Sequence, residues 1–202
     1  AMNKGETSST PSDKVVSLYK IEDYYAALEG GTSSVANTVK EDLIATDVAN
    51  GKDRDEAEES FYSKFASHIR NLYETGEVTD YKAKDMLVRY GDKTSDEAAS
   101  KVQYWSFKMQ YPDYDLSESA VSKYYSDVKP SGISVEIYYD YSKQRSKAEG
   151  VDLNGDGKTD SGSVKREVME IINSLPISSY QKDALYYLNG WASSTLWEAP
   201  WH

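Results

Sequence analysis

The sequence predicts an all-α fold, an array of about nine or ten short helices. Two observations carry this prediction. Apolar residues recur at intervals of three or four through almost every segment, and a glycine, an Asn-Gly pair or a proline closes most of these segments. Convincing period-two alternation is absent, although residues 133–139 are apolar and β-branched enough to allow a strand as the alternative.

Four of the predicted helices occupy the first half of the chain. Their apolar faces comprise, in order, Leu18, Ile21, Tyr25 and Leu28; Val35, Val39, Leu43, Ile44 and Val48; Phe61, Phe65, Ile69 and Leu72; and Met86 with Leu87. Their ends fall at Gly30, at Asn50-Gly51, near Gly76 and at Gly91, and Thr79 or Asp80 caps the fourth.

The remaining helices follow the same signals. Thr94-Ser95 opens a fifth helix with Ala98, Val102 and Trp105 on one face, and Pro112 follows its end. Two more are expected at 117–128 and 134–147. The next carries Val164, Val168, Ile171, Ile172 and Leu175 up to Pro176, and the last runs from Ser178-Ser179 to Gly190.

The chain divides, by this pattern, into three predicted parts. Residues 1–13 are polar and are expected to be a disordered tail or, at Ala1 and Met2, a cloning remnant. Residues 14–112 and 113–202 are predicted as two helical subdomains. Residues 78–91 align without gaps on residues 177–190, each with an aliphatic residue, a hydroxyl cap, a tyrosine and a final glycine. This indicates a duplicated unit, with convergence of short helical pieces as the alternative.

Residues 152–163 have the spacing of an EF-hand or dockerin calcium loop. Oxygen-bearing side chains stand at loop positions 1, 3, 5 and 9, and Gly157 at position 6 allows the turn that brings a backbone carbonyl to the ion. The predicted ligands are Asp152, Asn154, Asp156, the carbonyl of Lys158, Asp160 and Ser163.

The last of these ligands makes the loop unusual. Ser163 stands where a bidentate glutamate is expected, so the site loses two contacts and one charge. We therefore expect a weak structural Ca²⁺ site, with a Kd of roughly 10⁻⁴–10⁻³ M, that braces the C-terminal helices. An Asn-Gly-Asp-Gly turn without metal is the alternative.

Composition excludes several classes of function. A net charge of −11 disfavours direct nucleic-acid binding, which needs clustered Lys and Arg. The absence of cysteine removes disulfides and thiolate chemistry, and two histidines, His68 and His202, leave no zinc cluster or histidine-based triad. The sequence contains no run of about 20 apolar residues, the length that a membrane-spanning helix needs. No signal peptide is visible either, and localisation stays open.

Aromatic residues are the compositional anomaly. Tyrosine occurs 18 times and forms four adjacent pairs. A tyrosine can bury its ring while its hydroxyl stays in water, which is typical of thin helical layers with half-exposed cores. A protein–protein interface is the alternative explanation. Trp191, Trp197 and Trp201 crowd the C-terminus, where we expect them to cap the core, with docking to another chain as the alternative.

A likeness to known proteins is carried by eight segments, residues 116–121, 152–160, 162–165, 173–177, 181–191 and 198–201, with 39–44 and 87–91 upstream. These segments resemble an uncharacterised region of large tailed-phage and prophage proteins of Firmicutes. The resemblance implies a module of a longer polypeptide and brings no catalytic residues. The loop is also similar to a dockerin loop, but dockerins pair two such loops.

The sequence therefore favours a non-enzymatic structural or protein-interaction module, stabilised by Ca²⁺, whose partner is a virion or host protein. An acidic inhibitor that mimics nucleic acid is the second hypothesis. A carboxylate-based hydrolase is the third, with Asp113 and Asp115 or Glu58 and Glu59 as its candidate pairs.

Overall fold

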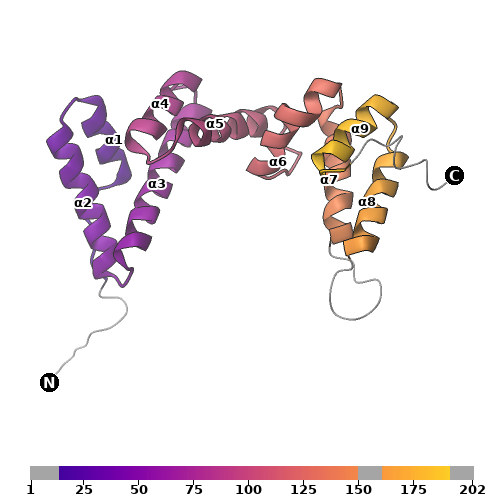
Figure 1. Cartoon of the computed structure of the whole chain (residues 1–202). Coiled ribbons are helices and arrows are strands. Elements are labelled where there is room, and N and C mark those ends of the chain that lie inside the picture. Colours follow the sequence, from indigo (N-terminus) through magenta and orange to yellow (C-terminus); the bar gives the residue numbers. More distant parts are fainter. Residues whose placement is uncertain (1–13, 150–160, 192–202) are drawn as a thin grey trace. The chain divides into compact units, whose positions relative to one another are not determined.

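The computed structural model of the chain describes residues 14–149 and 161–191, and every regular element in these ranges is helical (Figure 1). The predicted all-α class is therefore confirmed. Residues 133–139, for which a strand was the alternative, lead into and form part of helix α7. Among the described residues, no helix is both long and apolar enough to cross a bilayer.

The chain folds as two compact units, Ala1–Val102 and Gln103–His202. The N-terminal unit contains α1 (Ile21–Glu29), α2 (Ser33–Ala49), α3 (Arg54–Glu74) and α4 (Asp80–Tyr90). Helix α5 (Ser95–Gln110) continues through the division and contributes residues to both units. Its predicted inner face is confirmed, because Ala98, Val102 and Trp105 are all buried.

The core of the N-terminal unit forms where α1, α2 and α3 pack pairwise and α4 joins α3. The ring of Tyr24 meets Phe61 and Phe65 edge-on, with centroids 4.9 and 5.3 Å away. Edge-to-face contact of this kind stabilises aromatic pairs beyond the area they bury. Ile44, Ile69 and Leu87 complete a core that is closed to solvent.

The first two helices differ in part from prediction. Helix α1 begins at Ile21, so Leu18 lies outside it and is 89% exposed. Val35 and Val48, predicted on the inner face of α2, are also exposed, whereas Val39 and Ile44 are buried. Ala36, next to Val35 in the sequence, is buried, so this end of α2 is covered, and Val35 is exposed because it points about 100° away from Ala36. Val48 lies in the last turn of α2.

The C-terminal unit contains α6 (Glu118–Lys123), α7 (Val135–Glu149), α8 (Ser161–Ser174) and α9 (Ser179–Leu188). The helix predicted at 117–128 is interrupted. After α6 the chain widens into a π-helical turn, η2 (Tyr124–Val128), and then tightens into a 3₁₀ turn, η3 (Lys129–Ser131). Pro130 lacks a backbone N–H and cannot continue a regular helix.

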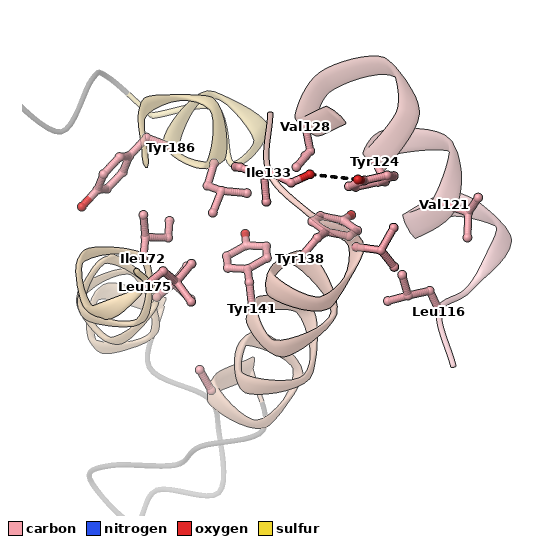
Figure 2. Close-up of a cluster of buried hydrophobic side chains, with 14 of the residues drawn as sticks. Leu116, Val121, Tyr124, Val128, Ile133, Tyr138, Tyr141, Ile172, Leu175 and Tyr186 are labelled. Atoms are coloured by element: carbon pink, nitrogen blue, oxygen red, sulfur yellow. Dashed lines mark hydrogen bonds between the residues drawn. The ribbon is translucent and has the colours of Figure 1, made fainter. Parts of the chain in front are cut away.

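Aromatic and aliphatic side chains from α6, η2, α7, α8 and α9 meet in one cluster, the C-terminal core (Figure 2). Tyr138 and Tyr141 project into it from α7, and Tyr186 enters it from α9. Trp191 packs at its edge, with its ring 6.3 Å from that of Tyr186. Trp191 thus follows the expectation that the tail caps the core, while Trp197 and Trp201 lie outside the described residues.

The four tyrosine pairs share one arrangement. In each pair the first ring is buried, and the second is half-buried or exposed. Consecutive helical residues point about 100° apart, so a pair at the edge of a core places one ring on each side of the boundary. The members of this set are Tyr24 and Tyr25, Tyr124 and Tyr125, Tyr138 and Tyr139, and Tyr186 and Tyr187.

Candidate protein-binding groove

The predicted calcium ligands are not placed by the structure. Asp152, Asn154, Asp156, Lys158 and Asp160 lie outside the described residues. The backbone of Ser163 lies in the first turn of α8, and its side chain is likewise outside the description. Within residues 14–149 and 161–191, no three acidic, histidine or cysteine side chains are gathered as a metal site. The Ca²⁺ site therefore stays a prediction.

Two of the four carboxylates considered for hydrolysis, Glu58 and Asp115, form ion pairs with basic side chains. Glu58 accepts a 3.0 Å hydrogen bond from Arg54, one helical turn away on α3. Asp115 lies 3.7 Å from Lys143 and its side chain is 88% exposed. Ion pairs of this exposed kind are typical of solvated surfaces and contribute little to stability.

A groove with a cavity volume of about 580 Å³ lies between α9 and the η2–η3 turns. One wall belongs to the turns and the other to α9. Its lining residues are Ser126, Asp127, Pro130, Ser131, Tyr180, Asp183, Ala184, Tyr187 and Leu188.

The two walls are joined by the cap of α9. Ser178 and Gln181 form a reciprocal capping box, with backbone-to-side-chain bonds of 3.0 and 3.2 Å. The amide nitrogen of Gln181 then donates to the carbonyl of Ser131 at 3.2 Å. Because the Gln181 side chain both caps the helix and bonds the opposite turn, this hydrogen bond holds the two walls at a set spacing.

The π-helical turn positions the other wall. The N–H of Lys129 bonds to the carbonyl of Tyr124, five residues back, which widens the turn. Tyr124 and Val128 are held in the core, and the Tyr124 hydroxyl donates a 2.8 Å hydrogen bond to the carbonyl of Ile133. Ser126 and Asp127, between these two anchors, are exposed at the groove. Turns of this class are often found at functional sites.

Two tyrosine rings dominate the α9 wall. Tyr180 and Tyr187 are seven residues apart, which places them on one face of the helix, and they are 72% and 61% exposed. Large exposed aromatic side chains are enriched where proteins bind one another.

The groove carries negative charge. Asp127 and Asp183 belong to its lining, and no lysine or arginine is among the described residues that line it. Lys182 donates to the carbonyl of Asn173 at 2.9 Å, and Lys129 lies over the ring of Tyr125 at 5.0 Å. The groove therefore combines aromatic faces with carboxylates, a combination that suits a cation.

Sequence reasoning did not identify this groove. Its two walls are about fifty residues apart in the chain, and the widened turn at 124–128 has no recognised sequence signal. The adjacent pair Tyr186 and Tyr187 gave a partial indication of the groove. Two neighbouring residues of a helix point in different directions, so one of the two rings was expected to lie at the surface.

Comparisons with protein-family models, with curated proteins and with solved structures found no match for this chain. The resemblance to phage and prophage proteins is accordingly neither supported nor contradicted by them.

Proposed function

We propose that this chain is a non-enzymatic protein-interaction module of a phage-derived protein, and that its groove binds a basic segment of a virion or host protein. The observation that carries the proposal is the lining of the groove, two exposed tyrosine rings and two carboxylates with no cation among its described residues.

An arginine or lysine side chain of a partner can bind both the tyrosine rings and the carboxylates of the groove. A guanidinium can lie over a tyrosine ring while its N–H groups bond a carboxylate, and such a cation–π contact contributes about 0.5–2 kcal/mol. The chain already forms this contact internally, since Lys40 lies 5.3 Å from the ring centre of Tyr62 and Lys143 lies 5.2 Å from that of Tyr139. The net charge of −11 also steers basic partners toward the surface.

The binding test uses fluorescence anisotropy with a short labelled peptide of alternating arginine and serine. A peptide with glutamate in place of arginine is its counterpart. We expect only the basic peptide to bind, and we expect binding to weaken as salt rises from about 0.05 to about 0.5 M. Replacing Tyr180 by Ala should weaken it about two- to thirtyfold, and the double change Asp127→Asn with Asp183→Asn should weaken it further.

The repeated helical unit provides matched controls. Tyr81 on α4 occupies the position of Tyr180 in the alignment, is 80% exposed and lies outside the groove. Tyr81→Ala and Asp80→Asn should leave peptide binding unchanged. If these controls lose as much affinity as the groove variants, the attraction is general surface charge and the groove is not the binding site.

We further propose that Ca²⁺ bound by residues 152–163 braces this unit. The loop connects Glu149, the end of α7, with Ser161, the start of α8; α8 packs on α7 and on α9, and α9 forms one wall of the groove. An ion held by the loop would restrict the separation of α7 and α8 and so support α9.

Thermal unfolding tests the brace. At about 1 mM Ca²⁺ and a Kd near 0.1 mM, binding adds roughly 1.4 kcal/mol and raises the Tm by about 3–6 °C over EDTA. The variant Asp152→Ala/Asp156→Ala should lose this shift, and Asp140→Ala, an exposed change on α7, should retain it. An unchanged Tm in the native chain would exclude the brace and leave the groove proposal standing.

A further inference from the structure

Residues 14–20, the N-terminal segment, lead into α1 without regular secondary structure. They include the most exposed aliphatic side chains in the part of the chain that the structure describes. Val16 is 84% exposed, Leu18 is 89% exposed and Val15 is 50% exposed. Isolated exposed apolar residues are ordinary, whereas a contiguous group of them marks a site of interaction. The N-terminal segment is therefore a candidate binding surface of the N-terminal unit.

Hydrogen bonds from α2 hold this segment in place. The side-chain amide of Asn50 pairs with the backbone of Val15 in both directions, because its oxygen accepts from the Val15 N–H at 2.7 Å and its nitrogen donates to the Val15 carbonyl at 2.8 Å. The hydroxyl of Ser17 donates to the carboxylate of Asp42. These bonds position the segment while its aliphatic side chains stay exposed. A segment that is ordered before binding loses less conformational entropy when a partner arrives.

A hollow with a cavity volume of about 520 Å³ lies beside the N-terminal segment, between it and residues of α2 and α3. Its charged lining is mainly positive, with Lys14, Lys20 and Lys64 against one carboxylate, that of Asp47, among the described lining residues. This carboxylate already has two cations near it, since its oxygen lies 3.7 Å from the ammonium nitrogen of Lys52 and 4.0 Å from that of Lys64. The aliphatic part of the lining comprises Val15, Val16, Ile21 and Leu43.

From this arrangement we propose that the hollow binds an acidic segment of a partner protein, in which carboxylate side chains are interspersed with aliphatic ones. The lysines attract the carboxylates, and Val16 and Leu18 offer apolar surface to the aliphatic side chains. Charge complementarity identifies this occupant, because the same segment of a second copy would bring Lys14 and Lys20 against like charges. The hollow belongs to the N-terminal unit, and the proposal does not rest on the tyrosine groove.

Fluorescence anisotropy with a short labelled peptide, in which glutamate alternates with leucine, tests the site. In one counterpart serine replaces every leucine, and in the other serine replaces every glutamate. We expect saturable binding of the glutamate–leucine peptide and at least about tenfold weaker binding of both counterparts, which lack the apolar contact or the attraction to lysine. The net charge of −11 repels acidic peptides from most of the surface, so binding of this peptide reports a local site.

Exposed side chains allow variants that leave the fold intact. Val16→Ser and Lys14→Gln should each weaken peptide binding about three- to tenfold while the Tm stays the same. Val35→Ser on α2 and Lys84→Gln on α4 are exposed changes outside the hollow and should leave binding unchanged. Absence of saturable binding, or equal weakening by the two pairs of variants, would overturn the proposal. So would a dimer in analytical ultracentrifugation that Val16→Ser dissociates, because it would assign this surface to a second copy.

Discussion

The hydroxyl of Tyr124 lies 2.8 Å from the carbonyl oxygen of Ile133 and donates a hydrogen bond to it inside the C-terminal core (Figure 2). The bond crosses from the first residue of the π-helical turn to the segment that enters α7. Both residues are buried, so water cannot replace the donor if it is removed. The contact thus fixes the turn that forms one wall of the tyrosine groove.

Replacing Tyr124 by Phe should lower the free energy of unfolding by about 1–3 kcal/mol, since it leaves the carbonyl of Ile133 buried without its donor. Urea unfolding followed by circular dichroism measures the change. Tyr81→Phe removes a hydroxyl from a ring that is 80% exposed and should alter stability very little. Equal stability of the two variants would contradict the role of this bond.

A second prediction concerns the residues that cap α4 and α9, which occupy the same position in the alignment of the two helices. Thr79 accepts a 3.1 Å hydrogen bond from the N–H of Lys82, and Ser178 accepts one of 3.2 Å from that of Gln181. Thr79→Ala and Ser178→Ala should each cost about 1 kcal/mol, because a backbone donor loses its acceptor. Ser179→Ala, one residue further into α9, should cost far less. Loss of stability in Ser179→Ala alone would show that the cap is misplaced.

The two aligned glycines should differ in what they tolerate. A Cβ on Gly91 would lie 2.7 Å from the carbonyl oxygen of Leu87, whereas Gly190 has open space but a φ of +77°. Asparagine accepts positive φ better than most residues but cannot relieve a steric clash. Gly190→Asn should therefore lower the Tm only slightly in thermal unfolding, and Gly91→Asn should lower it by several degrees more. The reverse order would be inconsistent with these backbone conformations.

Alkaline pH should unfold the chain through buried tyrosines. Burial, with smaller contributions from Tyr62 and Tyr90, raises the pKa of Tyr24 to about 12. Burial also raises the pKa of Tyr138 to about 12. Because each phenol is harder to ionise in the fold than in the unfolded chain, its contribution is complete below pH 10 and is lost as pH rises from 10 to about 12.

Urea unfolding at a series of pH values across this range checks the effect. Tyr24→Phe and Tyr138→Phe should each reduce the loss of stability between pH 10 and about 12, since one raised pKa is removed. Tyr81→Phe should follow the native chain. An identical pH dependence in all four proteins would rule out these two phenols as the cause.

Much of the helical architecture could be predicted because its signals are local. Thr79 caps α4, Ser178 caps α9, and Met86 and Leu87 face inward, all as the spacing and capping residues indicate. Prediction was wrong where packing decides, as at Leu18, Val35 and Val48, which are apolar yet exposed. Hydrophobic periodicity identifies a face, but the neighbouring helices determine how much of that face is covered.

The sequence by itself thus determined the all-α class and the helix boundaries set by caps and glycines, because hydrogen bonds between near neighbours specify them. The calcium loop at 152–163 stays a prediction from the spacing of its oxygen-bearing residues. Tertiary structure alone decided which ring of each tyrosine pair is buried and where oppositely charged side chains gather. The tyrosine groove joins α9 to turns that lie much earlier in the chain, and the hollow joins the N-terminal segment to α2 and α3. Only packing of these segments brings Asp127 to Tyr187 at the groove and Lys14 to Lys64 at the hollow.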